Sequence, residues 1–172
     1  GPRPLEGLPV AIKASAPVAG EPAERGSLAL RGMRAERTSP FTARVLAAGG
    51  IMHARSAAPE FSCATVTHSR LWGVTRNPWN PAFSPGGSSG GAGAALAAGT
   101  AALATGSDIA GSIRIPAACS GVVGYKPPRG RTPGDPPLGL DPYLQNGPMA
   151  RSVGDTALLA NVVSGPCPSD IT

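Results

Sequence analysis

Residues 86–112 have the sequence GGSSGGAGAALAAGTAALATGSDIAGS, which contains the most regular local pattern of the chain. The stretch opens with a loop made only of glycine and serine, at 86–91. In the following 92–104, eight of the thirteen residues are alanine, the best helix former. We therefore expect a tight glycine loop that leads into a closely packed helix over 92–104, and then a polar, glycine-containing turn over 105–114.

The segments upstream predict alternating strands and helices. Leu8–Lys13 is a short apolar run that reads as a buried strand ending at Lys13. A helix is expected after Ser39-Pro40, because serine is a good N-cap and proline suits the first helical position. Gly49-Gly50 ends it, and Ile51–Arg55 is the next expected strand. This alternation predicts an α/β architecture.

One further helix and one further strand complete the expected inventory of about three strands and three helices. Ser152 and Asp155 resemble a capping box that opens an apolar helix ending at Gly165-Pro166. The other expectations are a strand at Val122–Lys126 and irregular chain over Ser62–Pro85 and Arg129–Tyr143.

Composition and charge argue against a nucleic-acid partner. Fifteen basic and ten acidic residues give a net charge of +5, but the basic residues are scattered and only 4% of the chain is aromatic. Thirteen of the fifteen basic residues are arginine, which makes the two lysines, Lys13 and Lys126, unusual in this chain. We expect no nucleic-acid partner.

Neither a metal site nor a membrane span is expected. Cys63, Cys119 and Cys167 never form a C-x-x-C pair, and His53 and His68 lie far in sequence from any suggestive carboxylate pair. No apolar run reaches the length of a membrane span and no leader opens the chain, so we expect a cytoplasmic protein without a membrane or metal requirement.

The glycine-serine loop matches the pattern G-x-S-x-G with Ser88 or Ser89 at its centre. That pattern is weak in a segment made of two residue types. An α/β-hydrolase also needs a histidine after its serine, and no histidine follows His68. If the sequence is complete, that class of serine hydrolase is therefore excluded.

A serine can also be activated by a neutral lysine whose pKa is lowered by burial. Lys13 ends an apolar strand, although taken alone such a lysine is expected to reach solvent with its amine. The segment Ser107–Ser112 (SDIAGS) has the small residues that let successive backbone N–H groups converge on one point, as in an oxyanion hole. Each feature taken singly also fits an ordinary strand end or turn.

Together, these segments resemble the amidase signature family. The resemblance covers essentially the entire chain in register, and the step of 24 residues from Ser88 to Ser112 is the family's step. The matching segments are GLPVAIK at 7–13, WGVTRNPWN at 72–80, GGSSGG at 86–91, GSDIAGSIRIPAA at 106–118, GVVGYKP at 121–127 and GPMARSV at 147–153, followed by Asp155.

The resemblance implies a Ser, cis-Ser, Lys triad. Ser112 would be the nucleophile, Ser88 would follow a cis peptide bond with Gly87 and relay a proton, and Lys13 would be the base. The backbone N–H groups expected to form the oxyanion hole are those of Ile109, Ala110, Gly111 and Ser112. The residues expected to support the site are Gly87, Ser89, Asp108 and Arg114, the last two as an ion pair.

The chain departs from the family at two positions and in length. Ala14 stands where an aspartate usually follows the lysine, and Ala110 replaces a glycine of the oxyanion loop. If Ala110 must adopt a positive φ, its methyl group costs roughly 1 kcal/mol. The resemblance implies a mixed sheet flanked by helices, with residues 1–172 as its central portion, the N-terminal helices and the C-terminal part being absent.

The function implied is hydrolysis of a carbon–nitrogen amide bond through an acyl-serine intermediate, without a cofactor. A small-molecule amide would be the substrate, and the resemblance leaves room for a homodimer of the complete protein. Two alternatives stay open: a non-catalytic remnant or binding subunit, and the amidase subunit of a tRNA-dependent amidotransferase. Activity of the short form alone is doubtful, because a triad without its pocket cannot hold an amide within attack distance.

Overall fold

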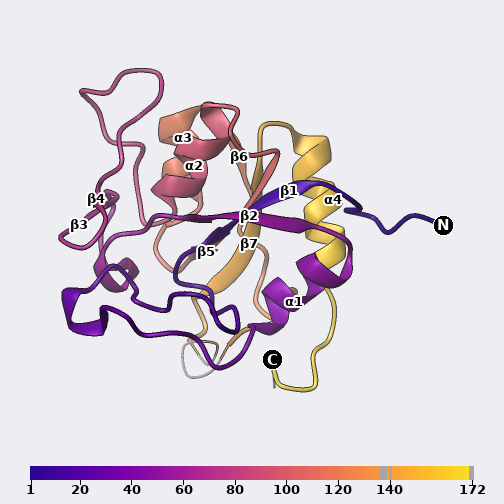
Figure 1. The fold of residues 1–172 in the computed structure, drawn as a ribbon. Helices are drawn as coiled ribbons and strands as arrows, with labels where there is room; N and C mark the ends of the chain where they lie inside the picture. Colours follow the sequence, from indigo (N-terminus) through magenta and orange to yellow (C-terminus); the bar gives the residue numbers. More distant parts are fainter. Residues whose placement is uncertain (136–138, 140, 171–172) are drawn as a thin grey trace.

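The computed structural model describes residues 1–135, 139 and 141–170 and has a mixed β-sheet with helices on both faces (Figure 1). The strands are β1 (Pro9–Lys13), β2 (Ile51–Ser56), β3 (His68–Ser69), β4 (Gly73–Val74), β5 (Leu103–Asp108), β6 (Val123–Gly124) and β7 (Gln145–Ala150). The helices are α1 (Pro40–Ala47), α2 (Gly90–Ala97), α3 (Arg114–Ser120) and α4 (Val153–Val163), with 3₁₀ turns at Leu28–Leu30 and Glu60–Ser62. The expected α/β class and helix-flanked mixed sheet are confirmed.

The order of strands in the main sheet is β2-β1-β5-β7-β6. Strand β1 runs parallel to both of its neighbours, β2 and β5, whereas β7 is antiparallel to β5 and β6. Because β1 and β5 are parallel neighbours, their carboxyl ends meet at one edge of the sheet. Lys13 ends β1 and Asp108 ends β5, so this edge gathers the polar residues singled out from the sequence.

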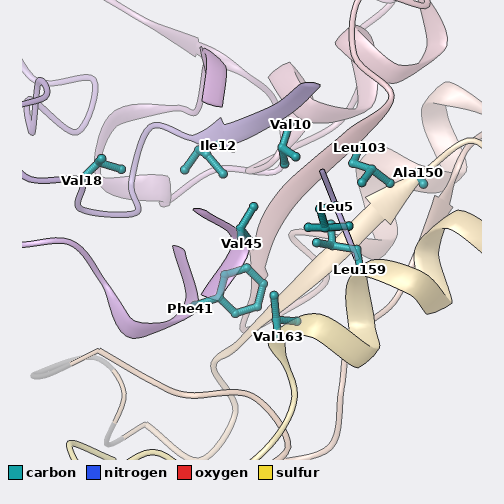
Figure 2. Packing of buried hydrophobic residues seen from close by; sticks show 10 residues of the cluster. All are labelled: Leu5, Val10, Ile12, Val18, Phe41, Val45, Leu103, Ala150, Leu159 and Val163. Carbon is teal, nitrogen blue, oxygen red and sulfur yellow. The ribbon is translucent and has the colours of Figure 1, made fainter. Parts of the chain in front are cut away.

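Alternate residues of the central strands face two separate cores. One core contains Val10 and Ile12 of β1 and packs under α1 and α4, with Phe41 and Leu159 among its members (Figure 2). The other contains Ala11 of β1 and packs under α2 and α3. The small side chains of the second core bring α2 and α3 close to the sheet. Gly93 of α2 shows the tightness, because a Cβ there would lie 2.9 Å from Ser120 Oγ of α3.

Serine caps hold the two helices that the sequence placed best. Ser39 Oγ accepts from the Thr42 N–H at the start of α1, and Ser152 Oγ accepts from the Asp155 N–H at the start of α4. Each contact satisfies one of the N–H groups that a helix end leaves without a partner.

The helix expected over 92–104 is wrong in its second half. Helix α2 ends at Ala97, where Gly99 follows with φ +73°, and the chain then enters strand β5 at Leu103. The polar turn expected over 105–114 is therefore wrong over 105–108, which belong to a central strand, and the turn begins only after Asp108. Pairing with β1 and β7 outweighs the weak strand propensity of alanine and glycine there, because strand formation depends on neighbours more than on local preference.

Two other expectations need correction. The strand expected at Val122–Lys126 is confined to Val123–Gly124, and strand β7 was not expected at all. The described residues also contain four α-helices and seven strands, more than the inventory drawn from the sequence. Within the irregular segment at 129–143, residues 136–138 and 140 lie outside the described residues. Over the described ranges, no helix is long and apolar enough to cross a membrane.

Neighbouring leucines in α4 provide a matched test of the core. Leu159 is fully buried, whereas Leu158 is 36% exposed. Leu159→Ala should lower the free energy of unfolding by about 2–5 kcal/mol, because it removes buried apolar surface and leaves a cavity. Leu158→Ala should cost much less. Denaturant titration of the complete gene product measures both, and equal losses would contradict this packing.

Candidate active site

A cavity of about 250 Å³ opens where the carboxyl ends of β1 and β5 meet the glycine-serine loop. Lys13, Ser88 and Ser112 all line it, as does Ser107 of β5. Because Lys13 is 75 positions from Ser88 in sequence, the fold and not local spacing assembles these groups. The predicted triad residues therefore share one cavity.

Lys13 is the most unusual residue of the site because its side chain is buried. Only 1% of its surface is exposed, so the expectation from the strand end alone, an amine in solvent, is wrong. Its Nζ atom lies 2.7 Å from Ser88 Oγ and 2.9 Å from Ser107 Oγ. Burial lowers the pKa of Lys13 from its ordinary value of 10.5 to about 7, although the negative charge of Asp108 opposes the shift.

Ser88 lies where the glycine-serine loop turns into α2. Ser88 is fully buried. The Gly87–Ser88 peptide bond is cis, as the resemblance implied. Gly87 has no room for a side chain, because a Cβ there would lie 2.7 Å from backbone atoms of Val66. The loop thus fixes the Ser88 hydroxyl beside the Lys13 amine.

Ser89 connects the serine loop to the loop that carries Ser112. The Ser89 N–H donates to the Ser112 carbonyl oxygen at 3.0 Å. Its hydroxyl also lies within 3.4 Å of both the backbone nitrogen and the carbonyl oxygen of Ser107. Ser89 makes these contacts without lining the cavity, which fits the supporting place that the resemblance gave it.

Asp108 organises the loop from β5 to α3. Its carboxylate accepts from the Gly111 N–H at 2.7 Å and the Ile113 N–H at 3.1 Å. The Arg114 guanidinium binds both oxygens, at 3.0 Å through Nε and 2.9 Å through Nη2. Burial alone would raise the pKa of Asp108, but Arg114 and the backbone N–H groups hold it well below its usual range. Asp108 and Arg114 form the expected ion pair, and neither lines the cavity.

The hydrogen bonds of this loop reduce the number of backbone N–H groups that are available for the predicted oxyanion hole. The Gly111 N–H is taken by Asp108, whereas the N–H groups of Ile109, Ala110 and Ser112 have no hydrogen-bond partner among the described residues. Ile109 and Ser112 line the cavity, and Ala110 lies between them in sequence. Ala110 has no positive φ, so its methyl group brings no strain of the kind considered for a glycine position.

Sequence reasoning did not give Ser107 a role of its own. Its hydroxyl is the second oxygen bound by the Lys13 amine, from the strand next to β1. The signal was present in part, because a hydroxyl at the carboxyl end of a parallel neighbour can reach a side chain that ends β1. This signal has meaning only if 103–108 is a strand, which the sequence did not predict.

Chemically, the site combines a buried amine with a low pKa, a hydroxyl in contact with it, a second hydroxyl in the same cavity and unpaired backbone N–H groups. Such a set can move a proton along a short path and stabilise a negative charge. No group of three or more His, Cys, Asp or Glu side chains within the described part of the chain could hold a metal ion.

Comparison with known proteins gives one consistent family. The profile of the Amidase family matches residues 2–172. A glutamyl-tRNA(Gln) amidotransferase subunit of Methylacidiphilum infernorum is 44% identical over 98% of this chain and 34% of that protein. The 6-aminohexanoate-cyclic-dimer hydrolase of Paenarthrobacter ureafaciens is 48% identical over 81% of this chain and 29% of its own length.

Solved structures agree with the sequence relatives. A 6-aminohexanoate cyclic dimer hydrolase complexed with substrate superposes with a TM-score of 0.92 at 39% identity, over 97% of this chain and 36% of that one. The native peptide amidase from Stenotrophomonas maltophilia gives 0.88 at 35% identity, over 98% and 36%. The chain thus spans about a third of the length of the relatives it matches.

The depressed pKa of Lys13 makes stability depend on pH. Because the folded pKa, about 7, lies below the unfolded value of 10.5, the unfolded state binds more protons between these values. Lys13 therefore opposes folding most below pH 7, and this penalty disappears as pH rises toward 10.5. Lys13→Met should raise the free energy of unfolding at pH 6 more than at pH 10, as measured by denaturant titration. A difference that is the same at both pH values would contradict the shift.

Proposed function

The chain belongs to the amidase family, and on this premise we propose that its cavity hydrolyses a carbon–nitrogen amide bond through an acyl-Ser112 intermediate. The observation that carries the proposal is the contact of 2.7 Å between the buried Lys13 amine and Ser88 Oγ, in a cavity that Ser112 also lines. A base, a relay and a nucleophile are the groups that acyl transfer from an amide requires.

In the first step, Ser112 Oγ attacks the amide carbonyl carbon and gives its proton to Ser88, while Ser88 gives its own proton to neutral Lys13. The carbonyl π electrons move to the oxygen. When the tetrahedral intermediate collapses, the carbon–nitrogen bond breaks and the leaving amine takes the proton back from Lys13 through Ser88. A water molecule then attacks the acyl carbon by the same proton path, releases the acid and restores the Ser112 hydroxyl.

Charge on the carbonyl oxygen needs donors that are free in the resting site. We assign this role to the N–H groups of Ile109, Ala110 and Ser112, because the Gly111 N–H is held by Asp108. Asp108 and Arg114 form an ion pair that holds the shape of the loop carrying Ser112. The Ser89 N–H links this loop to the glycine-serine loop. Gly87 allows the chain to pass close to Val66. None of these four supporting residues takes part in proton transfer.

Residues 1–172 are proposed to be the central portion of an amidase domain. The support is that they match only about a third of each relative's length. Since the remaining two thirds contribute to the pocket in a domain of this kind, the substrate is given only by class, a small-molecule amide. A cytoplasmic location and a homodimer of the complete protein stay predictions.

A second candidate function is the amidase subunit of a tRNA-dependent amidotransferase. It is favoured by the 44% identity to the glutamyl-tRNA(Gln) amidotransferase subunit of Methylacidiphilum infernorum. The two candidates use the same site but differ in dependence on other chains. Amide hydrolysis by the complete gene product alone supports the free amidase, whereas release of ammonia from glutamine only in the presence of partner subunits supports the amidotransferase.

Covalent labelling tests the role of Ser112. A fluorophosphonate should react with the complete gene product at Ser112: the serine oxygen bonds to phosphorus and fluoride leaves. Peptide mapping should place the adduct there, and Ser112→Ala should abolish labelling. Ser164→Ala, a change outside the cavity, is the control and should label normally. An adduct on Ser88 or Ser89 would reverse the assignment, and absence of any adduct would favour a non-catalytic remnant.

The pH profile tests Lys13 as the base. Only the neutral amine accepts a proton, so kcat/KM for a p-nitroanilide amide should rise with pH and level off above a midpoint near the pKa of about 7. Lys13→Met should lower kcat about 10²- to 10⁴-fold while the circular dichroism spectrum is unchanged. Near-normal turnover of this variant between pH 6 and 9 would exclude the role.

A further inference from the structure

Lys126, the second lysine of the chain, lies against the outer side of the loop that carries Ser112. Its Nζ atom donates to the Ile109 carbonyl oxygen at 3.2 Å and lies 3.5 Å from Asp108 Oδ1. The Lys126 side chain is 21% exposed, so the protein covers most of its surface. It does not line the cavity, and the proton path described above does not use it.

The contact fixes the direction of a peptide plane. The Ile109–Ala110 peptide bond is trans, so the Ile109 carbonyl and the Ala110 N–H point to opposite sides of one rigid plane. An ammonium group that holds the carbonyl on one side therefore turns the Ala110 N–H to the other. It also polarises the peptide group and strengthens its N–H as a donor.

Lys126 and Asp108 hold neighbouring peptide groups of the same short loop. Lys126 binds the Ile109 carbonyl, Asp108 binds the Gly111 N–H, and the two side chains form an ion pair with each other. The loop is thus tied on one side by two charged groups. The N–H groups of Ile109, Ala110 and Ser112, which these contacts do not use, are the ones assigned to the oxyanion.

The backbone that carries Lys126 is itself closely packed. The Tyr125 N–H donates to the Pro148 carbonyl of β7 at 3.1 Å. A Cβ at Gly147 would lie 2.2 Å from the Tyr125 carbonyl oxygen, and one at Gly124 would lie 2.8 Å from Ala117 of α3. Lys126 therefore extends from a fixed point toward the loop.

From these contacts we propose that Lys126 is a positioning residue for the oxyanion hole: it holds the Ile109–Ala110 peptide so that its N–H is ready for the carbonyl oxygen of the tetrahedral intermediate. This inference rests on the proposed amidase function. It assigns Lys126 no proton transfer and no contact with substrate. Lys126 thus orients a backbone donor for the oxyanion, whereas Lys13 accepts the proton.

The test compares Lys126→Met, which keeps the length of the side chain without its charge, with Lys126→Arg, which keeps a cationic donor. Arg129→Met is the matched control, because it removes an exposed positive charge three residues away that makes no ion pair within the described chain. For the complete gene product, kcat and KM on a p-nitroanilide amide and the rate of phosphonylation by a fluorophosphonate are measured, together with the pH profile and the melting temperature.

Lys126→Met should lower kcat and the phosphonylation rate together by about 10-fold or more, with KM changed less than about 2-fold. The midpoint of the pH profile should remain near 7, the pKa of Lys13. Lys126→Arg should recover most of the lost kcat and phosphonylation rate. Arg129→Met should behave as wild type in every measurement.

Three outcomes would overturn the inference. One is a Lys126→Met enzyme with wild-type kcat; another is a loss in which kcat falls only in proportion to the fraction unfolded. If Lys126→Met does not fold, Lys126→Arg is the deciding variant. A kcat of Lys126→Arg that is lower than wild type by about 10-fold or more, at a wild-type melting temperature, would then contradict the inference. An inactive, unlabelled wild type would instead refute the proposed function on which the inference rests.

Discussion

The site is built around a lysine amine that is held out of water beside a serine hydroxyl. Lys13 is 1% exposed and contacts Ser88 Oγ at 2.7 Å, an arrangement that costs free energy because burial disfavours a charged ammonium. The packing of the surrounding fold keeps the amine buried despite that cost. Strand β1 lies between two parallel neighbours, so its end is buried, and the glycine-serine loop is pressed against Val66. A buried amine of this kind is poor for stability and well suited to accept a proton near neutral pH.

The same site shows two different uses of charge. Asp108 is fully buried but remains ionised, because Arg114 and three backbone N–H groups donate hydrogen bonds to its carboxylate. Its role is architectural: it orders the loop whose other side leaves N–H groups unpaired. Among the described residues, the hydrogen-bond partners of the Lys13 amine are two serine hydroxyls, and the charge of Asp108 acts on it without a direct contact. Separating a fixed ion pair from an amine that can change its charge lets one loop stay rigid while the neighbouring group titrates.

The sequence predicted the elements with strong local signals and missed those defined by pairing. Ser39 and Ser152 cap helices where expected, and the apolar run ending at Lys13 is a strand. The alanine-rich segment misled, because nothing in residues 100–108 shows that β1 and β7 will pair with it. Among site residues, the resemblance placed Lys13, Ser88 and Ser112 in one cavity, but it could not show that Asp108 occupies the Gly111 N–H. Nor could it show the contacts of Ser107 and Lys126, since both depend on how distant segments meet in space.

In the proposed mechanism, Lys13 activates Ser112 through Ser88. The decisive measurement is a crystal structure of the complete gene product after reaction with a fluorophosphonate. It should show phosphorus bonded to Ser112 Oγ, with Ser88 Oγ within hydrogen-bond distance of both Ser112 Oγ and Lys13 Nζ. The phosphoryl oxygen should accept from the N–H groups of Ile109, Ala110 and Ser112. An adduct on another serine, or a Ser88 hydroxyl that contacts only one of the two groups, would contradict this mechanism.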